Sequence, residues 1–309
     1  MVMTMPTPAF PPNAVTAKAP GKINPLLRVG PPRADGYHDL LTCFVAVNIF
    51  ETVTVWPADE FQVTIQGDAH VDEVPLDGNN LVMKAAQAIG RVSGVVDPVA
   101  IHIDKQIPVG GGMAGGSADA AATLLALDEL WQTKLSTETL IALAAELGSD
   151  VPFLLEGGAS VGRGRGEILE PVESQQLWWV VIPQAAQLST PAMYQRLDVL
   201  RSDKTVSLPD QVSKEFLDAL YEGDATRLGP LLHNDMQRSA LDALPSLEKV
   251  LEVGVQAGAE GVLVSGSGPT VVWLARNKDH AQVLVEQATR KGWFAKATSS
   301  PARGAHLVV

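Results

Sequence analysis

The sequence PVGGGMAGGSA at residues 108–118 places five glycines within seven positions. An apolar stretch at 99–104 precedes this loop and predicts a strand, and the segment 117–131 follows it and predicts a helix with Ser117 as its N-cap. Glycines let the backbone turn its N–H groups toward a ligand, and a helix N-terminus adds positive potential. Strand, glycine loop and helix together predict a phosphate-binding loop that needs no basic side chain.

Two common phosphate-binding loops do not match this pattern. A Walker A loop carries Lys directly before its Ser or Thr, whereas Gly116 precedes Ser117 here. Gly110, Gly112 and Gly115 satisfy GxGxxG, but a dinucleotide fold needs a second strand ending in an acid after the helix. The segment 137–147 reads as a second helix instead, with Ser136 as its cap. A nicotinamide-binding fold is therefore disfavoured.

The rest of the chain alternates between strand and helix patterns. Before the loop we expect strands at 43–56, with a break near Glu51, and at 61–65, then a helix from Asn80 to Gly94. After it, 153–172 reads as a hairpin with a glycine-rich bend, because Pro152 opposes helix continuation. The later elements follow the order strand, helices, strand, strand, helix, strand: 177–183, 190–199, 213–221, 246–257, 261–265, 270–275, 279–291 and 293–298.

This order predicts an α+β layer in the second half. We divide the chain into a disordered tail at 1–14, a first domain at 15–170 and a second domain at 171–309.

Composition excludes several classes of protein. The 309 residues include 23 Lys and Arg against 35 Asp and Glu, a net charge of −12, which disfavours binding to nucleic acid. The single cysteine, Cys43, forms no internal disulfide, and the six scattered histidines predict no zinc site. No apolar run reaches membrane-spanning length, and the first residues lack a signal pattern, so a cytoplasmic protein is expected.

Three separated motifs resemble those of the GHMP kinases: KAPGK at 18–22, the glycine loop, and VSGSGP at 264–269. Three further motifs resemble the branch of that family that phosphorylates a cytidine-diphosphate sugar alcohol. These are GKIN at 21–24, RADGYH at 33–38 and LGSDVPF at 147–153. Pro25 departs from the family pattern, which has an aliphatic residue there, and leaves the local strand geometry open.

The resemblance implies a two-domain α+β GHMP kinase fold. Its first domain would resemble domain 2 of ribosomal protein S5, and its second would be ferredoxin-like. The implied reaction is ATP-dependent phosphorylation of the 2-hydroxyl of 4-diphosphocytidyl-2-C-methyl-D-erythritol, in the non-mevalonate route to isoprenoids. ATP with Mg²⁺ is the implied cofactor. The implied partners are small molecules and not a membrane, and the implied oligomeric state is a monomer or weak homodimer. Another small-molecule GHMP kinase, of mevalonate or homoserine type, and a non-catalytic regulator on this fold are the alternatives.

The same resemblance assigns residues to roles. Asp150 would accept the proton of the substrate hydroxyl, and Lys22 would contact that hydroxyl or Asp150 and offset negative charge. The ATP-binding residues would be Pro108, Val109, Gly110, Gly111, Gly112, Met113, Ala114, Gly115, Gly116, Ser117 and Ala118. The substrate-binding residues would be Asn24, Tyr37, His38, Tyr194, Gly266, Ser267 and Gly268, with Tyr37 and Tyr194 on opposite faces of the cytosine. No residue is assigned to a protein-held metal.

Overall fold

A computed structural model of the chain describes residues 10–67 and 71–308. Most of the tail predicted at 1–14 therefore lies outside the described residues. The first strand, β1 (Val15–Pro32), begins where order was expected. Just before it, the ring of Phe10 lies 5.5 Å from that of Trp56.

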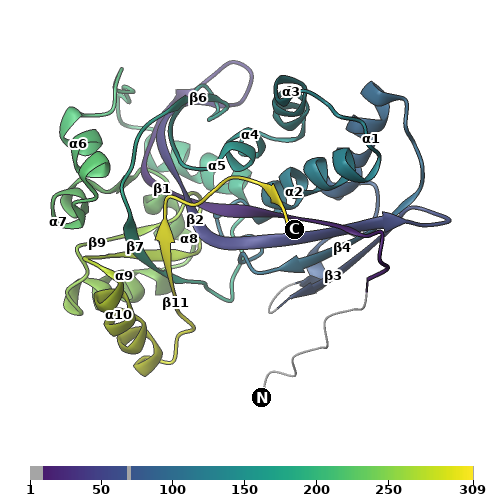
Figure 1. Ribbon diagram of the computed structural model, residues 1–309. Coiled ribbons are helices and arrows are strands. Elements are labelled where there is room, and N and C mark those ends of the chain that lie inside the picture. Colours follow the sequence, from purple (N-terminus) through teal and green to yellow (C-terminus); the bar gives the residue numbers. More distant parts are fainter. Residues whose placement is uncertain (1–9, 68–70, 309) are drawn as a thin grey trace.

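A large mixed sheet forms the first half of the molecule, and β1 lies near its centre. Its main path runs β12 (His306–Leu307), β1, β2 (His38–Pro57), β4 (Val99–Lys105) and β3 (Gln62–Gly67). The hairpin of β5 (Ala159–Arg163) and β6 (Ile168–Pro171) joins it through β2, and β8 (His233–Asn234) pairs with β1. On one side lie α1 (Leu81–Ser93), α2 (Gly115–Leu130), α3 (Thr137–Leu147) and α4 (Val151–Glu156) (Figure 1).

The second sheet has four antiparallel strands in the order β11 (Lys296–Ser300), β7 (Leu177–Ile182), β10 (Val271–Ala275), β9 (Gly261–Val264). The helices α9 (Ser246–Gln256) and α10 (Lys278–Arg290) complete a β-α-β-β-α-β arrangement (Figure 1). This order confirms the ferredoxin-like expectation. The helices α5 (Thr190–Leu200), α6 (Lys214–Glu222), α7 (Ala225–Leu228) and α8 (Gln237–Ala243) lie between β7 and α9 in the sequence.

The two sheets share a hydrophobic core. Along β7, Trp179 and Val181 belong to the cluster that also contains the first sheet, whereas Val180 and Ile182 pack with α9 and α10. This alternation is the period of two that a strand buried on both faces requires. The domain boundary predicted at 170 remains a prediction. The strands β8 and β12 follow residue 170 in the sequence but pair with β1 of the first sheet.

Several boundaries differ from the sequence prediction. The strand β2 continues through Glu51 without the expected end, and Phe61 lies outside β3. Residues 153–156 are helical, not part of the hairpin, because a proline in the first turn of α4 needs no N–H donor there. The strand predicted at 293–298 is β11, which lies at 296–300. The elements α7, α8, β8 and β12 have too few residues for a periodic signal.

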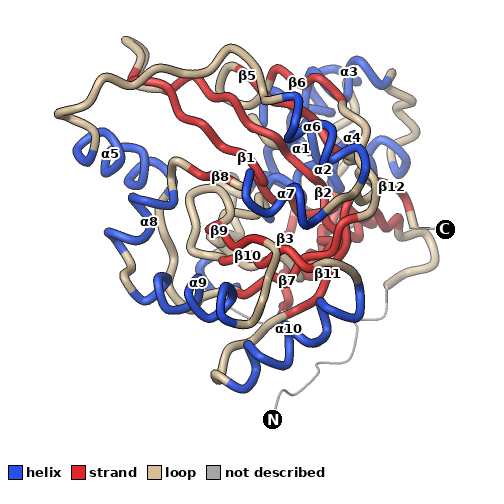
Figure 2. The backbone as a smooth tube through the Cα atoms, turned by 90° about the vertical axis from the view of Figure 1, so that its left-hand side faces the viewer, coloured by secondary structure: helices blue, strands red, loops and turns tan. Residues whose placement is uncertain are grey.

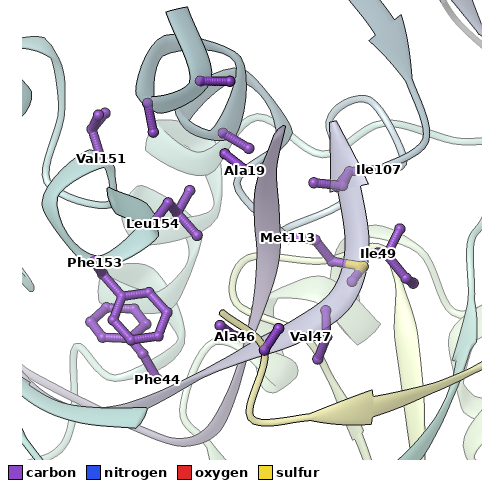
Figure 3. Close-up of a cluster of buried hydrophobic side chains, with 14 of the residues drawn as sticks. Ala19, Phe44, Ala46, Val47, Ile49, Ile107, Met113, Val151, Phe153 and Leu154 are labelled. Atoms are coloured by element: carbon purple, nitrogen blue, oxygen red, sulfur yellow. The ribbon is translucent and has the colours of Figure 1, made fainter. Parts of the chain in front are cut away.

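Buried aromatic and aliphatic side chains hold α4 against β2. The rings of Phe44 and Phe153 stack with centroids 5.1 Å apart, as Figure 3 shows. Met113, in the glycine loop, is fully buried beside Ile107 and Ile49 (Figure 3). Core packing therefore anchors both the glycine loop and the start of α4. Within the described residues, no helix has the length and apolar character of a membrane span.

Candidate active site

A cavity of about 830 Å³ lies between the glycine loop, β1, the start of α4 and α5. It gathers most of the residues that the sequence singled out. From the predicted set it is lined by Lys22, Asn24, Tyr37, His38, Pro108, Val109, Gly110, Gly111, Gly112, Ala114, Gly115, Gly116, Asp150, Tyr194, Gly266 and Ser267. Met113 and Ala118 are buried in the core instead, and Ser117 and Gly268 are not among the lining residues.

Lys22 is a buried cation that lines this cavity. Its Nζ donates to Asn24 Oδ1 at 2.7 Å and to the carbonyl oxygen of Gly112 at 3.3 Å. The Oδ2 atom of Asp150 lies 3.9 Å from the same nitrogen. Burial lowers the pKa of the Lys22 ammonium, and the charge of Asp150 opposes that shift. The lysine thus joins three segments that are far apart in the sequence.

A β-bulge aims Asn24 at this lysine. The pairing of β1 with β2 shifts register between Ile23 and Leu26, so Asn24 and Pro25 lie outside the regular ladder. Proline is tolerated at such a position because no ladder hydrogen bond from its nitrogen is needed. The Nδ2 atom of Asn24 donates to Thr42 Oγ1 at 2.8 Å, which orients the amide. The unusual proline therefore coincides with a bulge that turns a side chain toward the site.

Asp150 begins α4, but its side chain does not cap the helix. It occupies the N-cap position with no side-chain cap hydrogen bond. Apart from the ion pair with Lys22, this carboxylate has no hydrogen bond or ion pair within the described part of the chain. The side chain is 28% exposed and lines the cavity. Its oxygen atoms are therefore available to a bound molecule.

The glycine loop packs directly on the turn at 265–268. Ser265 Oγ donates to the carbonyl oxygen of Gly112 at 3.2 Å, and the Thr270 N–H donates to that of Gly111 at 3.3 Å. A Cβ on Gly112 would lie 2.1 Å from the carbonyl oxygen of Ser265. Gly112, with φ of +78°, is thus required by contact between two loops, in addition to any approach of a ligand.

The start of α2 corrects one expectation. The helix begins at Gly115, with Ala114 as N-cap in the left-handed region at φ +61°, so Ser117 lies inside the first turn and is not the cap. The first N–H groups of α2 have no intrahelical partner because of their position in the helix. Gly116 is exposed at the cavity, and a Cβ there would meet only Leu81, at 3.7 Å. Polarised N–H groups therefore face the cavity beside the loop.

A buried ion cluster beneath α2 was not predicted from the sequence. Lys105 Nζ lies 2.8 Å from Glu51 Oε1 and 2.6 Å from Asp119 Oδ2, and all three side chains are buried. Burial and the charge of Asp119 raise the pKa of Glu51 to about 8. The Nζ atom of Lys105 donates to Asp119 Oδ2, so this carboxylate of α2 is paired inside the core. The signal was Lys105 itself, a cation at the end of a strand whose residues 99–101 and 103 are apolar.

The aromatic residues form a second group in the same cavity. The ring of His38 stacks on that of Tyr194 at 5.0 Å with an angle of 20°, and its Nε2 lies 2.9 Å from Asp198 Oδ1. Tyr37 is 53% exposed, and the guanidinium of Arg165 lies 4.8 Å from its ring centroid. Asp198 was also missed, although it follows Tyr194 by four residues on α5 and therefore shares its face. The placement of Tyr37 and Tyr194 on opposite faces of a base remains a prediction.

Comparison with known proteins identifies the family to which this chain belongs. The family pattern described as GHMP kinases N terminal domain matches residues 80–158, and that described as GHMP kinases C terminal matches residues 216–293. The chain belongs to the GHMP kinase family, whose two-domain α+β fold it has.

Individual relatives carry a more specific name. A 4-diphosphocytidyl-2-C-methyl-D-erythritol kinase of Streptomyces avermitilis is 47% identical, over 96% of this chain and 100% of its own length. The enzyme of the same name from Leifsonia xyli is 44% identical, over 96% and 99%. A crystal structure of 4-(cytidine 5'-diphospho)-2C-methyl-D-erythritol kinase superposes with a TM-score of 0.77 at 33% identity, covering 93% of this chain and 99% of that one.

The raised pKa of Glu51 predicts how stability depends on pH. The folded protein keeps a proton on Glu51 up to about pH 8, whereas the unfolded chain releases it near its usual value, so this group's contribution to stability falls as pH rises between these limits. Replacing Glu51→Gln removes that loss. The free energy of unfolding of the variant relative to wild type should rise by about 1.4 kcal/mol per pH unit between pH 5 and 8.

Urea denaturation across this pH range measures the effect. Glu173→Gln, which removes an exposed carboxylate, is the control and should show no such slope. A constant difference between Glu51→Gln and wild type would contradict a protonated Glu51. Lys105→Met should cost about 3–5 kcal/mol, because it leaves the buried carboxylate of Asp119 without its cation.

Proposed function

We propose that this chain transfers the γ-phosphoryl group of ATP to the 2-hydroxyl of 4-diphosphocytidyl-2-C-methyl-D-erythritol. The observation that carries the proposal is the carboxylate of Asp150, which makes no capping hydrogen bond to α4. It lies 3.9 Å from the buried ammonium of Lys22 and lines the same cavity as the glycine loop. Phosphoryl transfer depends mainly on alignment and on neutralisation of charge, and this cavity offers groups for both. The names and high coverage of the relatives support this acceptor.

The two polar groups have complementary roles at the acceptor hydroxyl. Asp150 would accept the hydroxyl proton as the oxygen attacks phosphorus. Lys22, fixed by Asn24 and the Gly112 carbonyl, would hold the hydroxyl or Asp150 in place and offset the developing negative charge. Because the ammonium already has its partners before any substrate binds, little reorganisation is needed during the reaction.

The nucleotide would bind with its phosphates at the glycine loop and the first turn of α2. Backbone N–H groups there supply the positive potential that an acidic protein otherwise lacks. Among the described residues, no group of three or more His, Cys, Asp and Glu side chains could hold a metal ion. Mg²⁺ typically binds through substrate phosphates and one or two carboxylates, so we propose that it accompanies ATP.

The cytosine would lie at the aromatic end of the cavity. Tyr37 offers an exposed face, and His38, held by Asp198 and stacked on Tyr194, offers a ring nitrogen to the edge of the base. We further propose a cytoplasmic enzyme that acts as a monomer or weak homodimer. The free, buried Cys43 fits a reducing compartment.

Release of ADP with a panel of acceptor alcohols tests the proposal. The cytidine substrate should support turnover, whereas mevalonate and homoserine should give only background rates. Equal or faster turnover with mevalonate or homoserine would assign the chain to another branch of the family. The absence of turnover with every acceptor would favour a non-catalytic regulator.

Asp150→Asn should lower kcat by roughly 10²–10⁴-fold, because the amide cannot accept the proton. The dissociation constant for ATP should change by less than about threefold, since the carboxylate acts on the acceptor. Glu156→Gln, an exposed change on the same helix, is the control. Turnover of Asp150→Asn within about threefold of wild type would show that Asp150 is not the base.

Gly116→Glu tests the phosphate site without disturbing the fold. A Cβ added at Gly116 has room. A Cβ added at Gly112 does not, because Gly112→Val would displace the turn at Ser265. The added carboxylate at the start of α2 should weaken ATP binding by at least about tenfold through charge repulsion. Gly116→Ala supplies the Cβ without the charge. Equal ATP affinities of the Glu and Ala variants by calorimetry would argue against phosphates at this turn.

Tyr37→Ala tests the site of the base. Loss of one aromatic stack should weaken the cytidine substrate by roughly 5- to 150-fold and leave ATP affinity nearly unchanged. Because Tyr37 is half exposed, the melting temperature should change little. His38→Ala should reduce discrimination between cytosine and uracil substrates. A lower melting temperature, together with similar losses of affinity for donor and acceptor, would mean that these residues only stabilise the loop.

A further inference from the structure

A second cavity, of about 470 Å³, lies beside β8 and shares no lining residue with the candidate active site. One wall is the segment that follows α5, at 204–209, and another comes from His233, Asn234 and Asp235. Figure 2 shows α5, α8 and β8 together on one side of the molecule. The cavity is thus a separate feature of the fold.

Positive charge dominates this cavity. Four basic side chains line it, against a single carboxylate, Asp235, in a chain whose net charge is −12. The four cations are Arg28, Arg201, Lys204 and Arg238. The hydroxyl groups of Thr205 and Ser207 add neutral hydrogen-bond donors to the same lining. Such a set of donors suits an anion with several oxygen atoms.

The carboxylate does not neutralise the cluster. Asp235 Oδ2 lies 3.0 Å from Arg201 Nη2 and accepts from the Val29 N–H at 2.8 Å, and its Oδ1 lies 2.7 Å from His233 Nε2. Although burial acts to raise it, these contacts lower the pKa of Asp235 to about 2. Both oxygen atoms of Asp235 therefore already have partners. Neither the Lys204 ammonium nor the Arg238 guanidinium has an ion pair in the described part of the chain.

We propose that this cavity is a binding site for a small anion bearing a diphosphate group. Repulsion among clustered cations is unfavourable in the empty site, and an anion with three or four negative charges relieves it. A guanidinium donates two parallel hydrogen bonds to phosphate or carboxylate oxygen atoms alike. The four cations favour a diphosphate over a simple carboxylate because the diphosphate carries more negative charge.

The site is joined to the candidate active site through two elements. Arg201 is the C-cap of α5, which carries Tyr194 and Asp198. Asn234, in β8, donates to the carbonyl oxygen of Gly266 at 2.7 Å, and Gly266 lines the active-site cavity. An anion that competes with Asp235 for Arg201 acts on the end of α5. We therefore expect it to change acceptor affinity, a coupling that rests on the proposed function.

Calorimetry with inorganic pyrophosphate tests the site itself. The protein is first saturated with a non-hydrolysable ATP analogue, so that the glycine loop is filled, and free Mg²⁺ and ionic strength are held constant. Wild type should bind one pyrophosphate, and the variant Lys204→Ser/Arg238→Ser should bind at least about tenfold more weakly. The variant Lys291→Ser/Lys296→Ser removes two exposed cations elsewhere and should stay within about threefold of wild type.

Absence of binding at millimolar pyrophosphate, or equal weakening in both double variants, would overturn the site. The acceptor KM is then measured with and without pyrophosphate. It should shift in wild type and not in Lys204→Ser/Arg238→Ser, and an unchanged KM in wild type would overturn the coupling. A protein without any turnover would contradict the proposed function, whereas the calorimetry would still decide the anion site.

Discussion

The buried ammonium of Lys22 is the constraint on which the rest of this structure depends. A cation removed from water is costly unless several oxygen atoms surround it. Here the oxygen atoms come from Asn24 in a bulge of β1, from the carbonyl of Gly112 and from Asp150 at the start of α4. The charge can therefore be buried only when these three segments meet, and their meeting creates the cavity.

The second half of the chain completes that arrangement. The turn at Ser265 supports the Gly112 carbonyl, and Asn234 in turn holds the carbonyl oxygen atoms of Val264 and Gly266. Glycines at 112 and 266 are needed because the two loops approach too closely for side chains. The shared core along β7 fixes the second sheet against the first. The glycine loop is thus held by core packing through Met113 on one side and by the turn on the other (Figure 3).

The sequence predicted the larger elements and nearly half of the residues that line the cavity. Helices with a clear cap, such as α1 after Asn80 and α3 after Ser136, begin where expected, because their caps and apolar periods are local signals. The motif residues Lys22, Asp150 and His38 line one cavity. No local signal predicts this, and only the family resemblance indicated it. What could not be predicted was long-range. The pairing of β12 with β1 and the ion pair of Lys105 with Asp119 depend on packing that one sequence does not display.

A double-mutant cycle on turnover tests the central claim most directly. If Lys22 and Asp150 act as one unit on the acceptor hydroxyl, Lys22→Met/Asp150→Asn should lose about as much kcat as Asp150→Asn alone. Circular dichroism and melting curves establish that each variant is folded. Losses that multiply, so that the double variant is slower by the product of the two single effects, would show that the two groups act independently and would contradict this account.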